Sequence, residues 1–165
     1  MVSLGNFKSQ SKYVSLNNYI EFGKCEALNT QGNFGLKETF GYGGTMKSNE
    51  GDPEIIVKIT FKEKLSCTGI MIEGLDGETC PKKLKIFSGN FNIDFSDLDS
   101  IKATEELTVV SGKIISLKLA KYRNIDCLAL FLSNEEADLL KINSIQIFGE
   151  GGENTDMSQV KNTNP

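Results

Sequence analysis

The sequence predicts an all-β protein folded as a β-sandwich. Short apolar runs, several of them alternating with polar residues, recur over residues 57–148. Clusters of Gly, Asn, Asp and Ser separate these runs, and no long segment has the period of an amphipathic helix. Many short strands without a long helix are typical of sandwiches and barrels.

Six strands are expected, at residues 57–61, 65–72, 84–86, 115–119, 128–132 and 145–147. Residues 57–61 alternate as a half-buried strand does, and 115–119 is the most regular alternation in the chain. Residues 128–132 are apolar on both faces, which favours a central strand. After the last strand, Phe148 should lie on the face opposite to Ile145 and Ile147.

Two short helical turns are predicted, at residues 35–40 and 96–106. Ser96 is a suitable N-cap, and Asp97 and Asp99 follow in the first turn, where carboxylates favour the positive helix end. Together with Asp94, these aspartates suggest calcium, which binds six to eight oxygens. Their spacing is not that of an EF-hand loop, so turn and helix-start roles are the favoured interpretation.

The chain should form one sandwich domain over residues 14–150, with a loose N-terminal segment at 1–13 and a flexible tail at 151–165. A chain of 165 residues is long enough to bury roughly 70% of its unfolded surface. The net charge of -4 and the single arginine, Arg123, argue against nucleic-acid binding.

The N-terminus lacks the apolar region of a secretion signal, and no apolar run is long enough to span a membrane. We therefore expect a cytoplasmic protein, which also fits the nucleus, with no membrane attachment. We expect the protein to be a monomer on its own.

Catalysis is not expected. The chain contains no histidine, which excludes the common nucleophile–histidine pairs and histidine-ligated metals. Its four cysteines are widely spaced with no C-x-x-C, so free thiols are favoured over a disulfide or zinc site. Residues 41–48 approach a phosphate-binding loop, but Met46 replaces a required glycine and no helix is expected to follow. No cofactor or metal is predicted.

Several phrases occur in a specific order along the chain. They lie at residues 25–29 (CEALN), 52–57 (DPEIIV), 81–87 (PKKLKIF), 94–95 (DF), 122–124 (YRN), 130–134 (LFLSN), 145–149 (IQIFG) and 155–161 (TDMSQVK). In order and spacing they resemble the PITH domain, a proteasome-interacting module found at the end of thioredoxin-like proteins and as a stand-alone family. This chain is similar to the stand-alone type, without a thioredoxin domain.

The resemblance implies a jelly roll of the galactose-binding-like type. It also implies a non-catalytic interaction module that binds the regulatory particle of the 26S proteasome. One departure falls at residues 134–140, where the family's Gly and Thr are missing and the loop is shorter. If this loop contacts a partner, that contact has changed.

The expected partner-binding residues are Lys82, Lys83, Lys85, Tyr122, Arg123, Asn134, Glu135 and Met157. The three lysines, with Lys58, Lys62 and Lys64, suggest a basic face on adjacent strands, the alternative being a solvated face that protects a strand edge. Tyr122 and Arg123 are residue types that contribute binding energy at interfaces, although Tyr122 is equally suited to the core. Met157 belongs to a tail that either orders on a partner or has no fixed structure.

Two other functions stay open. The protein could be a ligand-binding jelly roll for a carbohydrate or small polar ligand, with or without calcium, although carbohydrate sites commonly use an exposed aromatic platform and the chain has no Trp. A redox enzyme would need a reactive thiolate, against which the missing C-x-x-C argues.

Overall fold

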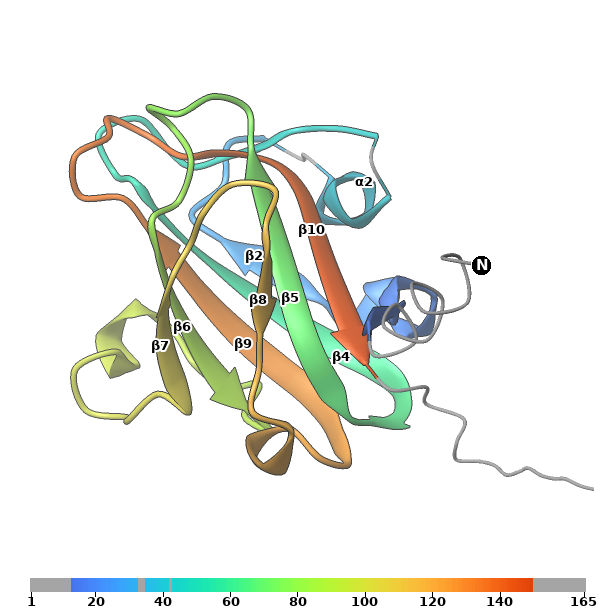
Figure 1. The fold of residues 1–165 in the computed structure, drawn as a ribbon. Helices are drawn as coiled ribbons and strands as arrows, with labels where there is room; N and C mark the ends of the chain where they lie inside the picture. The colour runs from blue at the N-terminus through green and yellow to red at the C-terminus, as the bar shows by residue number, and fades with distance from the viewer. Residues whose placement is uncertain (1–12, 33–34, 42, 150–165) are drawn as a thin grey trace, which may run out of the picture.

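The computed structural model describes residues 13–32, 35–41 and 43–149, which form two antiparallel sheets packed face to face (Figure 1). The strands are β1 Val14–Ser15, β2 Glu26–Leu28, β3 Met46–Lys47, β4 Glu54–Leu65, β5 Cys67–Gly74, β6 Lys83–Ser88, β7 Glu105–Thr108, β8 Ile114–Ser116, β9 Ile125–Ser133 and β10 Lys141–Gly149. The short helices are α2 Leu36–Phe40 and the 3-10 turns η2 Asn17–Tyr19, η3 Phe22–Lys24, η4 Phe95–Asp97 and η5 Leu119–Lys121.

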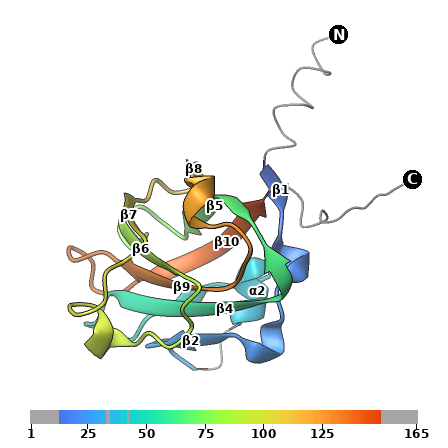
Figure 2. The same cartoon turned by 90° about the horizontal axis from the view of Figure 1, so that it is seen from below.

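One sheet has the order β1-β10-β5-β8, with β3 also paired to β10, and the other has the order β2-β4-β9-β6-β7. Seen along the sandwich, the β10–β5 pair lies over the β4–β9 pair (Figure 2). The all-β sandwich prediction is therefore confirmed, and β9 is central, between β4 and β6, as its two-sided apolar pattern indicated.

The main core lies between the sheets. Alternate residues of each long strand enter it, because side chains in a strand point to opposite faces in turn. The fully buried members include Val57 and Ile59 from β4, Leu130 from β9 and Ile145 and Ile147 from β10. Phe148 is only partly buried, and its ring contacts Tyr13, so it lies on the other face of β10 as expected.

A second, smaller core covers the outer face of the β4–β9–β6 sheet. Ile56, Phe87 and Ala129 project from the strands, and Ile93 packs on them from the segment 89–104. This segment leaves Lys58 only 9% exposed, with its Nζ 3.5 Å from a Glu26 oxygen and 5.4 Å from the centre of the Phe91 ring. The alternating pattern of residues 57–61 predicted one exposed face, but segment 89–104, which is distant in sequence, covers that face.

Two local predictions need correction. Residues 115–119 do not form one strand: β8 ends at Ser116, and Leu119 begins η5, because the chain turns there from one sheet to the other. The N-cap of η4 is Asp94 and not Ser96. An Asp94 oxygen accepts from the Ser96 amide at 3.0 Å, and Asp97 accepts in return from the Asp94 amide at 3.0 Å.

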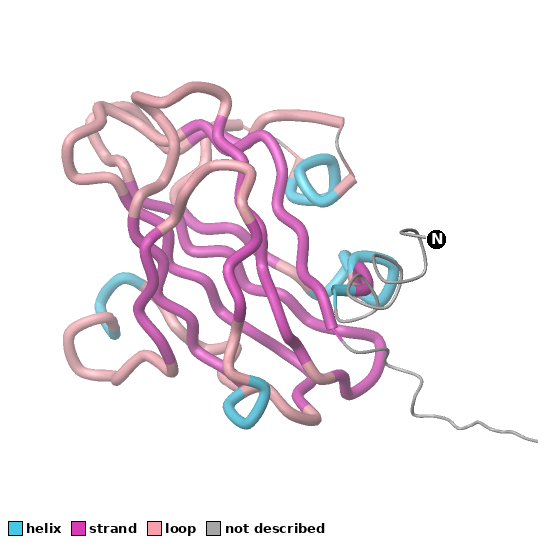
Figure 3. Tube along the Cα trace, in the orientation of Figure 1, coloured by secondary structure: helices cyan, strands magenta, loops and turns pink. Residues whose placement is uncertain are grey.

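The two ends of the sandwich differ. The loop end contains residues 48–54, 75–83 and 134–141, and the hairpin end contains residues 62–66 and 117–126. Long loops gather at the loop end, and the β4–β5 turn and η5 lie at the opposite end (Figure 3). β4 runs from Glu54 at the loop end to Leu65 at the hairpin end, about 36 Å at 3.3 Å per residue.

Candidate interaction surface

Asn134 is the centre of the loop end. Its side chain is 3% exposed, and its amide donates to the carbonyl oxygens of Cys80 at 3.0 Å and Glu78 at 3.3 Å. Its side-chain oxygen accepts from the Glu136 amide at 3.1 Å, and its own backbone amide donates to the Pro53 carbonyl at 3.1 Å. The Asn134 side chain therefore joins loop 75–83 to loop 134–141, and the Asn134 backbone amide joins them to loop 48–54.

Further bonds fix the same loops. The Ser48 hydroxyl accepts from the Leu140 amide at 2.8 Å, and the Gly51 amide donates to the Asp138 carbonyl at 2.8 Å. The loop 134–140 is thus held by backbone and side-chain partners at several points. A surface held in this way loses little conformational entropy when a partner binds.

Four of the expected partner-binding residues meet at this end. Lys82 pairs with Glu136 at 3.3 Å, and Lys83 pairs with Glu135 at 3.8 Å. A hollow of about 400 Å³ lies beside the first pair, lined by Gly77, Glu78, Thr79, Lys82, Asn134, Glu136, Ala137 and Asp138. Asn134 itself is structural, because its buried amide is fully used, whereas Lys82, Lys83 and Glu135 are exposed.

The loop end is acidic. Its segments carry eight Asp and Glu residues and three lysines. Burial, followed by the neighbouring charge of Asp52, raises the pKa of Glu54. Lys82 and Lys83, which suggested a basic docking patch, are already paired with carboxylates of this end.

The expected basic face is not continuous. Lys82, Lys83 and Lys85 lie on or next to β6, whereas Lys58, Lys62 and Lys64 lie on β4, and β9 runs between these strands. Lys58 is buried, and the Lys85 Nζ lies 5.9 Å from the centre of the Phe131 ring. The prediction of adjacent strands was wrong, because strand order depends on pairing between distant segments.

Tyr122 belongs to the core and not to an exposed surface. Its side chain is fully buried, and its hydroxyl donates to a Glu105 carboxylate oxygen at 2.9 Å. Burial and this bond raise the pKa of the Tyr122 hydroxyl. Of its two suggested roles, the structure shows the core role, and the partner-contact role is corrected. Met157 lies outside the described residues.

Arg123 is exposed at the hairpin end. It lies about the length of β4 away from Lys82, Lys83 and Glu135, so one small partner segment cannot contact both ends of the sandwich. The sequence alone offered no indication that these residues occupy opposite ends.

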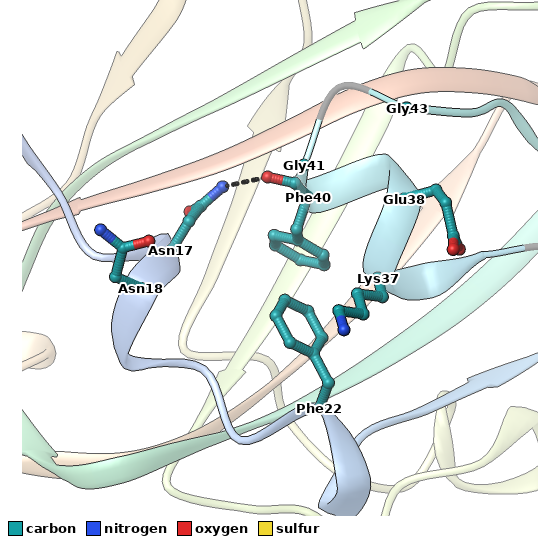
Figure 4. A pocket seen from close by; sticks show the side chains of 8 residues that line it. All are labelled: Asn17, Asn18, Phe22, Lys37, Glu38, Phe40, Gly41 and Gly43. Atoms are coloured by element: carbon teal, nitrogen blue, oxygen red, sulfur yellow. Dashed lines mark hydrogen bonds between the residues drawn. The ribbon is translucent and has the colours of Figure 1, made fainter.

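A further hollow, of about 350 Å³, lies between η2, η3 and α2 (Figure 4). The rings of Phe22 and Phe40 lie with centres 5.9 Å apart, and the Asn17 amide donates to the Phe40 carbonyl at 2.9 Å. Lys37 and Glu38 stand at its rim. No sequence motif marks this hollow, because its residues come from three short elements that are separate in the sequence.

The chemistry of the described residues is modest. All four cysteines are free, and burial raises the pKa of Cys67 to about 12 and also raises the pKa values of Cys25 and Cys127. Within residues 13–32, 35–41 and 43–149, no three His, Cys, Asp or Glu side chains come together as a metal site would require. The described helices are all too short or too polar to cross a membrane.

Comparison with known proteins gives a consistent family match. Residues 7–165 match the family model described as PITH domain. PITH domain-containing protein 1 of Dictyostelium discoideum is 31% identical over 152 residues, which cover 82% of this chain and 72% of that protein. The expected family resemblance is therefore confirmed.

Solved structures show the fold. The family 32 carbohydrate-binding module of NanJ from C. perfringens, in complex with galactose, has a TM-score of 0.60 at 8% identity, over 82% of this chain and 98% of the module. A GH29 fucosidase of Ruminococcus gnavus, in complex with fucose, has a TM-score of 0.64 at 9% identity. That match covers 91% of this chain but only 29% of the fucosidase chain. The galactose-binding-like jelly roll is thus confirmed.

Proposed function

This chain belongs to the PITH domain family, and on that premise we propose that it is a non-catalytic protein-interaction module that binds the regulatory particle of the 26S proteasome. The match of the family model over residues 7–165 carries the proposal. Proteasomes occur in the cytoplasm and the nucleus, so the proposal includes both as the place of action.

The loop end supports this proposal with a suitable surface. Loops 48–54, 75–83 and 134–141 are tied by buried bonds, and they present charged groups of both signs, including the Lys82–Glu136 pair. Taken as a whole, a non-obligate interface is about as polar as the rest of a protein surface, and its rim is polar and solvent-accessible. We propose Lys82, Lys83 and Glu135 as contact residues there.

Affinity capture tests the proposal. The tagged full chain is used as bait in native lysate at low and moderate salt, and bound proteins are identified by mass spectrometry. Enrichment of regulatory-particle subunits is expected. The double variant Glu135→Lys, Glu136→Lys should reduce the capture, because it reverses two exposed charges of the loop end.

A matched control variant is Asp99→Lys, Glu106→Lys, which makes the same change of net charge at exposed positions outside residues 48–54, 75–83 and 134–141. This control should capture the same subunits as the unaltered chain. If folded bait recovers no regulatory-particle subunit at either salt concentration, the proteasome proposal fails. A bait that ends at Gly149 shows separately whether residues after the sandwich contribute.

A second candidate function is binding of a carbohydrate or small polar ligand, with or without calcium. The hollow of Figure 4 favours it, since it combines the Phe22 ring with the polar groups of Asn18 and Lys37. Thermal unfolding with millimolar galactose, fucose and calcium tests this function, because a ligand of the native state raises the melting temperature. The absence of any shift with these ligands would remove the candidate.

A further inference from the structure

We propose that the hairpin end docks a carboxylate-rich segment of a protein partner, with Arg123 as the central contact. This inference rests on the proposed function as an interaction module, and it adds a second surface and the chemistry of the partner. It comes from the distribution of charge, from the geometry around Arg123 and from a hollow beside it.

The hairpin end is positively charged in a protein of net charge -4. Residues 62–66 and 117–126 carry five cationic side chains, namely Lys62, Lys64, Lys118, Lys121 and Arg123, and two acidic ones, Glu63 and Asp126. All five cations are exposed, and none forms an ion pair with another described residue. Lys82 and Lys83 of the loop end, by contrast, are paired with carboxylates.

The backbone on both sides of Arg123 is anchored. Tyr122 is buried, and its carbonyl accepts from the Cys67 amide at 3.1 Å while its hydroxyl donates to Glu105. Asn124 adopts a left-handed conformation with φ of 54°, and its amide donates to the Ser66 hydroxyl at 3.1 Å. Arg123 thus projects from a turn fixed at both neighbours, which limits the entropy lost when the side chain binds.

A hollow of about 300 Å³ lies beside this turn, lined by Ser66, Leu119, Arg123 and Asn124. It offers a guanidinium, a hydroxyl, an amide and one aliphatic wall. Guanidinium groups bind carboxylates through two parallel hydrogen bonds, a geometry that lysine does not reproduce. The hollow therefore suits a carboxylate side chain whose methylene groups lie against Leu119.

The opposite charges of the two ends decide the chemistry of the partner. An acidic segment is attracted to the hairpin end and repelled by the loop end, with its eight acidic residues against three lysines. A nucleic acid is disfavoured, because its binding needs many neutralised phosphates and the whole chain has one arginine. An acidic peptide needs only the few cations that this end provides.

The test uses the full chain and a short fluorescein-labelled peptide in which Glu alternates with Ser, with a Gln-for-Glu peptide as the control ligand. Fluorescence anisotropy measures binding at low and moderate salt. The Glu peptide should bind, more weakly at the higher salt, and the Gln peptide should not. Arg123→Gln should weaken binding about tenfold, since it removes a charge-assisted bidentate contact.

Two double variants separate the surface from net charge. Lys62→Gln, Lys64→Gln should weaken binding, whereas Lys113→Gln, Lys141→Gln removes the same charge outside the hairpin end and should leave it unchanged. The proposal is wrong if Arg123→Gln binds as the unaltered chain does, if this control variant loses as much affinity, or if a single-stranded oligonucleotide binds more tightly than the Glu peptide.

Failure of this proposal is distinguishable from failure of the proteasome proposal. Peptide binding through Arg123 without any captured regulatory-particle subunit would refute the proteasome partner and leave the acidic docking surface. Equal capture of those subunits by the unaltered chain and by Arg123→Gln, without peptide binding, would refute the docking surface alone.

Discussion

Replacing Asn134 by alanine should loosen the loop end and lower the stability of the whole domain. The change removes two hydrogen bonds donated to backbone carbonyls, at 3.0 and 3.3 Å, and one accepted from the Glu136 amide at 3.1 Å. Each such bond contributes about 1 kcal/mol net, so the free energy of unfolding should fall by about 3 kcal/mol. The melting temperature should fall by about 6–12 °C for a domain of this size.

Urea unfolding followed by circular dichroism measures this change, with the slope m compared to confirm that unfolding remains two-state. Asn18→Ala is the matched control, because that side chain is exposed and makes no hydrogen bond with a described residue. It should change the free energy by less than about 0.5 kcal/mol. A loss for Asn134→Ala as small as that of the control, at unchanged m, would refute Asn134 as the anchor of the three loops.

Three other predictions concern groups with shifted pKa values. Tyr122→Phe should lower the free energy of unfolding in urea by about 1–2 kcal/mol through loss of the bond to Glu105, whereas Tyr19→Phe, a control with no such bond, should not. Bonds from Ser96 hold the pKa of Asp94 below its usual range, so they stabilise the fold above about pH 3.9, and this contribution is lost as the pH falls through the lower folded value. Asp94→Asn should therefore make the free energy of unfolding fall less steeply as the pH is lowered from neutral. An unchanged slope in an acid titration would contradict this cause. Burial raises the pKa of the Cys67 thiol to about 12. The protonated thiol therefore contributes its full stability below about pH 8.5, and this contribution is lost as the pH rises toward 12. Cys67→Ala should reduce the fall in the urea midpoint from neutral to alkaline pH, and an equal fall in both proteins would contradict burial of Cys67 as the cause.

The proposed module presents two differently charged surfaces at its opposite ends. The loop end, with Lys82, Lys83 and Glu135, presents paired charges on rigid loops, and the hairpin end presents cations around Arg123 that form no ion pair with a described residue. A partner that contacts both ends must extend along the sandwich. A small partner contacts one end only, so variants of the two ends should separate the two kinds of partner.

Several features of the fold could be predicted because they depend on neighbouring residues. Alternation of apolar and polar residues predicted most strands, and the two-sided apolar run at 128–132 predicted the central position of β9. The ordered phrases from residue 25 to 161 predicted the family, which depends on the order of residues and needs no contacts. The missing histidine likewise limits the possible chemistry, since composition alone decides which residue types the chain can use.

The arrangement of the candidate surfaces depended on contacts between distant segments. Because β9 lies between β4 and β6, the lysines of β4 are separated from those on or next to β6, and segment 89–104 buries Lys58. The core took up Tyr122 and left Arg123, its neighbour, exposed, although both residue types suit an interface. Strand periodicity fixes which side of a strand a residue faces, but only the pairing of strands and the packing of loops decide what lies against that side.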